Sequence, residues 1–288
     1  MTKINNPIYV STACLPPGVT VKSRVLQYIA CDLQNIELGA NVEVNSDLGF
    51  LSNYQAQFLV HNYFPPPQDP FVLNLASKDE NIRKRSIELV LNAIDLSSKI
   101  GAPFYSVHAG FITDPTSFGE TSFIFPSPES RTAIKDSWSN FISSLDIVLE
   151  YSRKVGVDLL LENNVCSPDL VDKVMLVKPE EFQMLLLNKV SHPNLGILLD
   201  TGHLSVSAQT LGFNKFRFID QITPYIKAIH IHDNSGKADT HDKVVEGSWV
   251  LDVLTDPNFI AATKVIESKF NNIKEIKQYK NWLTTKIC

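Results

Sequence analysis

The sequence predicts an α/β fold, a single (β/α)8 TIM barrel in which eight parallel strands alternate with helical segments. Three observations support this fold class. Eight short apolar runs alternate with helix-length segments along the chain, without a linker or repeat that would divide it. Six of these runs stop at a residue that can bind a metal. The 288 residues, 44% of them hydrophobic, can bury one large core, so we expect a single domain over residues 1–288.

The predicted strands are four to six residues long and apolar, as expected for parallel strands that are covered on both faces. They lie at residues 8–11, 35–38, 58–61, 104–108, 159–162, 196–200, 227–232 and 264–267.

The segments between the strands carry helix signals. After Ser77, a candidate N-cap, residues 79–80 place acidic groups in a first turn, and apolar residues recur with helical spacing from Ile87 to Ile94. Gly101 stands where a C-terminal cap belongs. The pattern predicts a helix that ends just before Gly101.

Three later segments follow the same logic. An apolar stripe from Ile134 to Leu149 is closed by Gly156, and another helix begins with Pro179 at its first position. The lysine-rich segment from Asn271 predicts a last helix on the outside of the barrel. Prolines at 65–67 and 70 predict a stiff loop over the barrel mouth, with an ordinary connector as the alternative.

The strand endings predict a shared metal site. A charge or imidazole at the end of a buried strand costs several kcal/mol in desolvation unless it is paired or metal-bound. In a barrel of this kind the carboxyl ends of all strands meet at one face, so residues that are distant in sequence become neighbours. The six endings are His61, His108, Glu162, Asp200, His230 and Glu267.

Three further candidates follow directly after these strands. His203 stands in the segment DTGH, and Asp239 and His241 form a DxH pair after the seventh strand. Imidazole and carboxylate ligands together suit Zn, Mn, Fe or Co. Nine ligands exceed what one ion can use, so we expect two or three divalent transition metal ions.

The composition limits the kinds of binding partner that we expect. The net charge of -5 gives no global basic field for nucleic acid or an anionic membrane, which leaves nucleic acid as the less favoured partner. No segment approaches the roughly 20 apolar residues of a membrane span. The four cysteines lie far apart and form no CxxC pair, which favours reduced thiols. We expect a cytoplasmic protein that does not bind membranes; the oligomeric state stays open.

In this context six segments of the chain resemble the xylose-isomerase-like TIM-barrel superfamily. They are VHNYFPPP, SVHAG, LLENN, LLDTGHL, IHIHDNSGKADTHDKVVEG and VIES. That superfamily includes sugar phosphate isomerases and epimerases and the endonuclease IV family (AP endonuclease family 2). The resemblance implies a four-ligand core at Glu162, Asp200, His230 and Glu267. It implies that the additional ligands of an endonuclease-like trinuclear site fall on His61, His108, His203, Asp239 and His241.

Two functions follow from this resemblance. The favoured function is isomerisation or epimerisation of a small carbohydrate or phosphorylated substrate, with Glu162 and Glu267 as catalytic residues that remove and return a proton. The N-terminal part, with its NIEL strand, reads like the sugar-isomerase branch. The alternative is an endonuclease IV-like phosphodiesterase that acts on abasic DNA or another phosphodiester.

Five residues near the strand ends are candidate substrate-binding residues, each with an ordinary structural explanation as well. Aromatic rings can stack on a sugar or simply pack a loop, and an asparagine can orient a ligand or form a turn. A lysine can receive a phosphate or remain solvated. The five are Tyr63, Phe64, Asn163, His232 and Lys237. Glu37, near the end of the second strand, can also assist the site, without a firm ligand role.

Overall fold

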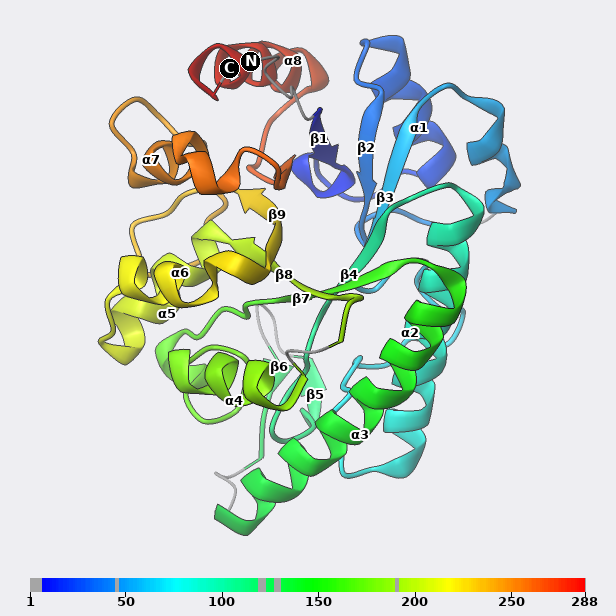
Figure 1. The fold of residues 1–288 in the computed structure, drawn as a ribbon. Coiled ribbons are helices and arrows are strands. Elements are labelled where there is room, and N and C mark those ends of the chain that lie inside the picture. The colour runs from blue at the N-terminus through cyan, green and yellow to red at the C-terminus, as the bar shows by residue number, and fades with distance from the viewer. Residues whose placement is uncertain (1–6, 45–46, 119–122, 127–130, 190–191, 288) are drawn as a thin grey trace.

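Eight parallel strands close into a barrel in the computed structural model, which confirms the predicted fold class (Figure 1). The structure describes residues 7–44, 47–118, 123–126, 131–189 and 192–287. Around the barrel the strand order is β1, β10, β9, β8, β7, β4, β3, β2, with β1 closing on β2. The barrel strands are β1 (Ile8–Ser11), β2 (Asn35–Leu38), β3 (Gln57–His61), β4 (Phe104–His108), β7 (Asp158–Glu162), β8 (Leu195–Asp200), β9 (Ile226–Ile231) and β10 (Thr263–Ile266). All eight predicted strands are present, with bounds shifted by at most one residue.

The helices surround the barrel (Figure 1). They are α1 (Val21–Ala30), α2 (Glu80–Lys99), α3 (Arg131–Val155), α4 (Pro179–Lys189), α5 (Thr201–Leu211), α6 (Lys215–Ile222), α7 (Trp249–Thr255) and α8 (Ile273–Ile287). A small antiparallel hairpin of β5 (Ser117–Phe118) and β6 (Phe123–Ile124) stands between β4 and α3 in the chain. The helices predicted before Gly101 and Gly156, at Pro179 and after Asn271 are confirmed, and both glycines have positive φ angles of 72° and 78°.

The start of α2 corrects one prediction. Asp79, and not Ser77, is the N-cap, because its side chain accepts hydrogen bonds from the backbone N–H groups of Asn81 and Ile82. Such a cap stabilises a helix by about 1 kcal/mol. The Ser77 hydroxyl instead donates to Asp114, with Oγ 2.7 Å from Oδ2, and this contact holds the loop before the helix.

The interior of the barrel explains why the strand ends face inward. Side chains of a strand alternate between its two faces, so positions two residues apart share one face. A buried apolar layer inside the barrel includes Leu59, Leu160, Leu198, Ala228 and Val265. Two residues beyond each of these stands one of the predicted ligands at a strand end. The floor of the site is therefore the apolar core, and its walls are the next inward-facing positions.

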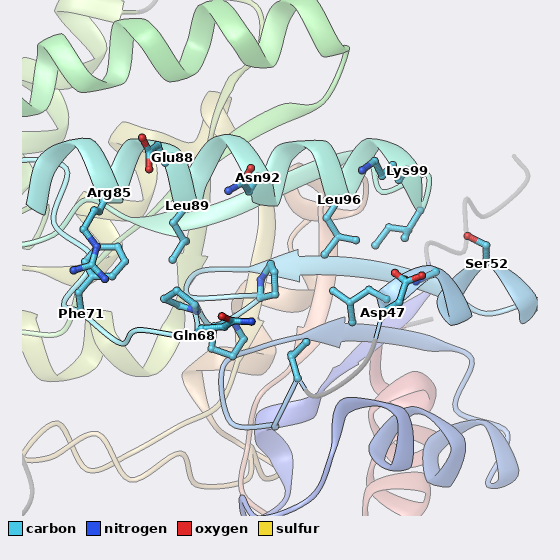
Figure 2. Close-up of a pocket in the computed structure, with 17 residues that line it drawn as sticks. Asp47, Ser52, Gln68, Phe71, Arg85, Glu88, Leu89, Asn92, Leu96 and Lys99 are labelled. Carbon is cyan, nitrogen blue, oxygen red and sulfur yellow. The ribbon is translucent and has the colours of Figure 1, made fainter. Parts of the chain in front are cut away.

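The interval between β2 and β3 departs from the predicted alternation. Its described residues form the short 3-10 helix η2 (Leu48–Asn53) in place of an α-helix. A groove of about 1160 Å³ lies between η2, α2 and the residues after β3, as Figure 2 shows. Leu89 and Leu96 of α2 and the ring of Phe71 help to form it (Figure 2). This groove lies on the outside of the barrel, apart from the metal-ligand candidates.

The prolines after β3 are divided between two surfaces. Pro65, Pro66 and Pro67 line the outer groove beside α2, so the prediction that they cover the barrel mouth is wrong. Pro70 does line a cavity at the mouth. Phe64, directly before these prolines, is fully buried in the core.

Two composition-based expectations concern cysteines and membranes. Cys14, Cys31 and Cys166 are free thiols, as predicted, and Cys288 lies outside the described residues. Within the described part of the chain, no helix combines the length and the apolar character that a bilayer crossing requires.

Candidate metal centre

The Glu162 carboxylate lies at the centre of the predicted ligands. Its Oε2 is 3.5 Å from Nε2 of His61 and 3.5 Å from Nε2 of His108. Its Oε1 is 3.3 Å from Nδ1 of His203 and 3.5 Å from Nδ1 of His230. The ends of β3, β4, β7 and β9 and the start of α5 thus converge on one fully buried carboxylate.

The four residues of the implied isomerase core are assembled around His230. Its Nδ1 lies 3.2 Å from Oε2 of Glu267 and 3.6 Å from Oδ2 of Asp200, in addition to the 3.5 Å contact with Glu162. The parallel register pairs Asp200 with His230, which fixes the two residues side by side at the mouth. An imidazole nitrogen that faces three carboxylates is a suitable position for a cation.

A second group of ligands lies beside this core. Oδ2 of Asp239 is 3.4 Å from Nε2 of His203 and 3.1 Å from Nε2 of His241. Asp239 and His241 come from the long segment after β9, and His203 from the first turn of α5. His61 and His108 with Glu162 form a third group, whose candidate ligand atoms all lie within 4.8 Å of one another. The structure thus brings all nine predicted ligands together.

Hydrogen bonds fix the orientation of several imidazole rings. Nδ1 of His61 lies 3.0 Å from Oγ of Ser106, and Nδ1 of His203 lies 3.0 Å from the carbonyl oxygen of Asn163. A backbone carbonyl can only accept, so His203 is protonated on Nδ1 and its Nε2 faces Asp239 with a lone pair when the ring is neutral. His241 repeats this arrangement, with Nδ1 3.1 Å from the carbonyl oxygen of Glu267.

His230 is oriented by Glu37, a carboxylate that the sequence placed near the site without a firm ligand role. Its Nε2 lies 3.0 Å from Oε2 of Glu37, on β2, and both side chains are fully buried. A carboxylate on one ring nitrogen makes the other a stronger metal ligand and holds the ring in place. The signal in the sequence was the charge of Glu37 within the apolar NIEL run. The sequence did not show that His230 is the hydrogen-bond partner of Glu37.

Two of the predicted substrate-binding residues face Asp200. Nε2 of His232 lies 2.9 Å from Oδ2 of Asp200, and the Asn163 side chain exchanges two hydrogen bonds with the Asp200 backbone. Asp200 also accepts a hydrogen bond from the backbone N–H of His203 as the N-cap of α5. The buried side chains of Asn163 and His232 therefore position a candidate ligand.

The other three predicted substrate-binding residues, Tyr63, Phe64 and Lys237, lie in different environments. Tyr63 is half-buried and lines a cavity at the mouth. Phe64 is fully buried within the hydrophobic core, so it is a core residue and not part of the cavity wall, which corrects its assignment as a substrate-binding residue. Lys237 is exposed on the loop after β9.

The charges of the site shift the pKa values of its members. Burial alone lowers the pKa of His203, but Asp200 and Asp239 outweigh burial and hold that pKa well above its usual value. For His230, burial is likewise outweighed by Glu37 and Glu267, which raise its pKa. Burial alone would raise the pKa of Glu267, but His230 and then His241 lower it to about 2.

The pKa of His108 is shifted in the opposite direction to those of His203 and His230. Burial lowers the pKa of its imidazole to about 4, against the opposing effect of Glu162. His108 is therefore neutral at pH 7, the state in which an imidazole can bind a metal.

Buried polar atoms without hydrogen-bond partners indicate that this donor set fits metal ions. Among the described residues these atoms include both oxygens of Glu162, Nδ1 of His230 and Oδ1 of Asp239. A buried polar atom without a partner costs about 1–3 kcal/mol, and more when it is charged. Divalent cations would satisfy all of these atoms at once, and the mixture of imidazole and carboxylate suits a transition metal.

Comparisons with known proteins agree with the barrel fold. A family model described as a xylose isomerase-like TIM barrel matches residues 48–285. The chain is 27% identical to a probable endonuclease 4 of Aquifex aeolicus, over 72% of this chain and 71% of that protein. It is 23% identical to a fructoselysine 3-epimerase of Shigella flexneri, over 65% of this chain and 59% of that protein. A solved structure of a D-tagatose 3-epimerase-like protein has the same fold, with a TM-score of 0.70, 22% identity and coverage of 98% of this chain and 99% of that one.

Proposed function

The chain belongs to the xylose isomerase-like TIM-barrel family, and from this premise we propose that it is a metal-dependent isomerase or epimerase of a sugar or sugar phosphate. One observation carries the proposal. Glu162, Asp200 and Glu267 surround Nδ1 of His230 at 3.2–3.6 Å, which assembles the four-ligand core. The proposed cofactors are two or three divalent ions of Zn, Mn, Fe or Co.

The residues of the core suit a proton transfer beside a carbonyl group. A divalent ion held by Glu162, Asp200, His230 and Glu267 would supply Lewis acidity toward two adjacent oxygens of a hydroxy-ketone. Glu267 is ionised at neutral pH because its pKa is lowered to about 2, so its carboxylate can accept a proton. In the barrel order β7, which carries Glu162, and β10, which precedes Glu267, are separated by β8 and β9. The two glutamates thus approach a substrate from different sides.

In the proposed reaction, Glu162 and Glu267 remove and return the proton. One glutamate takes the proton from the carbon beside the carbonyl, and the electron pair of the C–H bond moves to form an enediolate of the substrate. Inversion requires that the other glutamate holds a proton, which it returns to the opposite face of that carbon. Return of the proton to the neighbouring carbon would instead interconvert an aldose and a ketose.

The contacts of three arginines favour a small substrate over DNA. Phosphate contacts dominate the affinity of proteins for DNA, and arginine is a major source of them. Arg24 and Arg83 donate to backbone carbonyl oxygens, and Arg85 pairs with Asp69. A relative named as a fructoselysine 3-epimerase supports the same choice.

Exchange of hydrogen with solvent tests the proposal. The metal-loaded protein in D2O should introduce deuterium beside the carbonyl of at least one member of a panel of ketoses, aldoses and their phosphates. Glu162→Gln and Glu267→Gln should abolish the exchange, while Glu80→Gln, at an exposed glutamate on α2, should preserve it. Metal content is measured for each variant, so that loss of the base is separated from loss of the ion. Absence of exchange across the panel would contradict the proposal.

A second candidate function is a phosphodiesterase of the endonuclease 4 type. The specific observation in its favour is the additional group formed by His203, Asp239 and His241 beside the core. Clusters of closely spaced metals stabilise both attacking and leaving oxygens at phosphorus. The relative named as a probable endonuclease 4 supports it as well.

Duplex DNA with one abasic site tests this second function. If it is correct, the metal-loaded protein nicks the DNA at the abasic position, and binding weakens as salt is raised. His241→Ala should remove the activity. Intact DNA after incubation at low salt with added Zn or Mn would exclude this candidate.

A further inference from the structure

A cavity of about 610 Å³ adjoins the metal-ligand candidates at the barrel mouth. His108 and His203 form part of its wall, so one end of the cavity meets the nine-residue site. Its other walls come from the segments after β3, β4 and β7 and from the hairpin strand β6. The volume falls within the range of roughly 300–1,000 Å³ that is usual for small-ligand sites.

Most of the other residues that line the cavity are apolar. Two phenylalanine rings, Phe111 and Phe123, meet edge to face, with centroids 5.4 Å apart and an interplanar angle of 74°. Aromatic rings in this arrangement present faces and edges that suit another ring. The apolar wall residues that carry the argument are Phe71, Val72, Phe111, Phe123, Leu170 and Val174.

Two polar wall residues, Tyr63 and Asn164, are engaged in contacts within the protein. The hydroxyl oxygen of Tyr63 accepts a hydrogen bond from the backbone N–H of Phe71, 2.8 Å away. The side-chain amide of Asn164 donates to the carbonyl oxygen of Met175, also at 2.8 Å. A polyhydroxylated chain that lies against the apolar residues of this wall would leave water without recovering all of its hydrogen bonds, which is unfavourable.

We propose that this cavity binds an apolar or aromatic substituent of the substrate. The inference deepens the proposed function and rests on it for the carbohydrate part: the substrate class is a sugar or sugar phosphate that carries such a group near the reacting carbons. The polar end of the substrate lies at the carboxylates and histidines, and the substituent lies between Phe111, Phe123 and Leu170. Binding of the substituent gains free energy in proportion to the apolar area removed from water.

Two hydroxamates test the cavity independently of any reaction. A hydroxamate offers two adjacent oxygens to a metal, as a hydroxy-ketone does, and its tail can be varied. On the metal-loaded protein, 3-phenylpropionohydroxamate should bind at least about tenfold more tightly than acetohydroxamate, as measured by calorimetry, because its phenyl group is buried.

Neighbouring residues of β6 provide a matched pair of variants. Phe123→Ala should reduce the preference for the phenyl tail at least about threefold, because it removes one aromatic wall. Ile124→Ala should preserve that preference, since Ile124 is 51% exposed and is not part of the wall. Phe111→Ala serves as a second test of the wall, with thermal unfolding of each variant as the control for folding.

The outcomes separate this inference from the proposed function. Equal affinity for the two hydroxamates, binding of neither, or a phenyl preference that survives both Phe111→Ala and Phe123→Ala would overturn the inference. Failure of deuterium exchange, with the phenyl preference intact, would overturn the isomerase function and leave the apolar cavity. If exchange does occur, a 6-O-benzyl ketose should have a KM at least about tenfold below that of the unsubstituted ketose.

Discussion

Glu37 on β2 accepts a hydrogen bond from His230 on β9, with Oε2 3.0 Å from Nε2, although the two residues are 193 positions apart. In the barrel order β1 and β10 separate the two strands, so the contact crosses the interior. Because Nε2 donates to Glu37, Nδ1 is the nitrogen that faces Glu162, Asp200 and Glu267. A buried carboxylate thereby decides which atom of His230 is offered to a metal.

The first prediction concerns this pair. Glu37→Gln keeps the shape of the side chain but removes its charge, so metal affinity should fall by about 10- to 100-fold. Competition with a chromophoric chelator measures the loss, and nitrogen NMR of the His230 ring reports its tautomer. Glu43→Gln, at an exposed glutamate of the same β2–β3 interval, is the control. Unchanged affinity in Glu37→Gln would show that the contact does not position His230.

The second prediction uses the additional group of ligands to separate the two candidate functions. His241→Ala removes a contact of 3.1 Å to Asp239 and keeps all four side chains of the core. Metal content should fall by about one equivalent per chain, because one ion loses a ligand. If the protein is an isomerase, deuterium exchange should persist in this variant. Elemental analysis and exchange are measured on the same preparation, and His230→Ala should abolish the exchange.

The third prediction is that metal binding releases protons at pH 7. The pKa values of His203 and His230 are raised by neighbouring carboxylates after the opposing effect of burial, so both rings hold protons at neutral pH in the metal-free protein. A metal must displace these protons, so its apparent affinity should increase as pH rises. Calorimetry in two buffers that differ in ionisation enthalpy counts the protons. A heat that is independent of the buffer would contradict this expectation.

The fourth prediction concerns the stability of the metal-free protein. A histidine whose folded-state pKa is raised contributes stability that is complete below its unfolded pKa of 6.5 and is lost as pH rises through the folded value. Each tenfold gain in proton affinity on folding adds about 1.4 kcal/mol to this contribution. The melting temperature after EDTA treatment should therefore fall on the alkaline side of pH 6.5, while the metal-loaded protein should change less. Parallel melting curves across that range would argue against buried histidinium ions.

The Glu267 carboxylate contributes to stability with the opposite pH dependence. Glu267 has its pKa lowered to about 2 from 4.5, since the histidines outweigh burial. Its contribution to stability is present above pH 4.5 and is lost as pH falls toward 2. The metal-free protein should thus be most stable between the acidic limit set by Glu267 and the alkaline limit set by the two histidines.

The fifth prediction concerns Gly202, in the first turn of α5. A Cβ atom at this position would overlap the ring of His232, which holds Asp200 through a 2.9 Å contact. Gly202→Ala should displace His232 and lower metal affinity at least about tenfold, as expected when an outer partner of a ligand is lost. Gly39→Ala is the control, because its added Cβ would meet its nearest neighbour at 3.6 Å. Chelator competition on both variants makes the comparison.

The amino-acid sequence alone predicted the fold and the nine candidate ligands that the structure brings together at the barrel mouth. Apolar runs with polar endings, at His61, Glu162 or Asp200 for example, follow from local chemistry and from strand alternation, which need no tertiary knowledge. Once the strands form a parallel barrel, their ends must meet at one face. Helix ends such as Gly101 and Pro179 were likewise readable because caps are local.

Only the tertiary structure decided how these residues are used. The partner of Glu37 is 193 residues away, so no local pattern could assign its contact with His230. Burial of Phe64 and the position of His232 beside Asp200 depend on packing between segments that are distant in sequence. Packing between distant segments also decides that η2 replaces a helix and that an apolar wall lies next to His108. Sequence periodicity determines which face of a strand points inward. Contacts between strands determine which side-chain atoms of the site interact with one another.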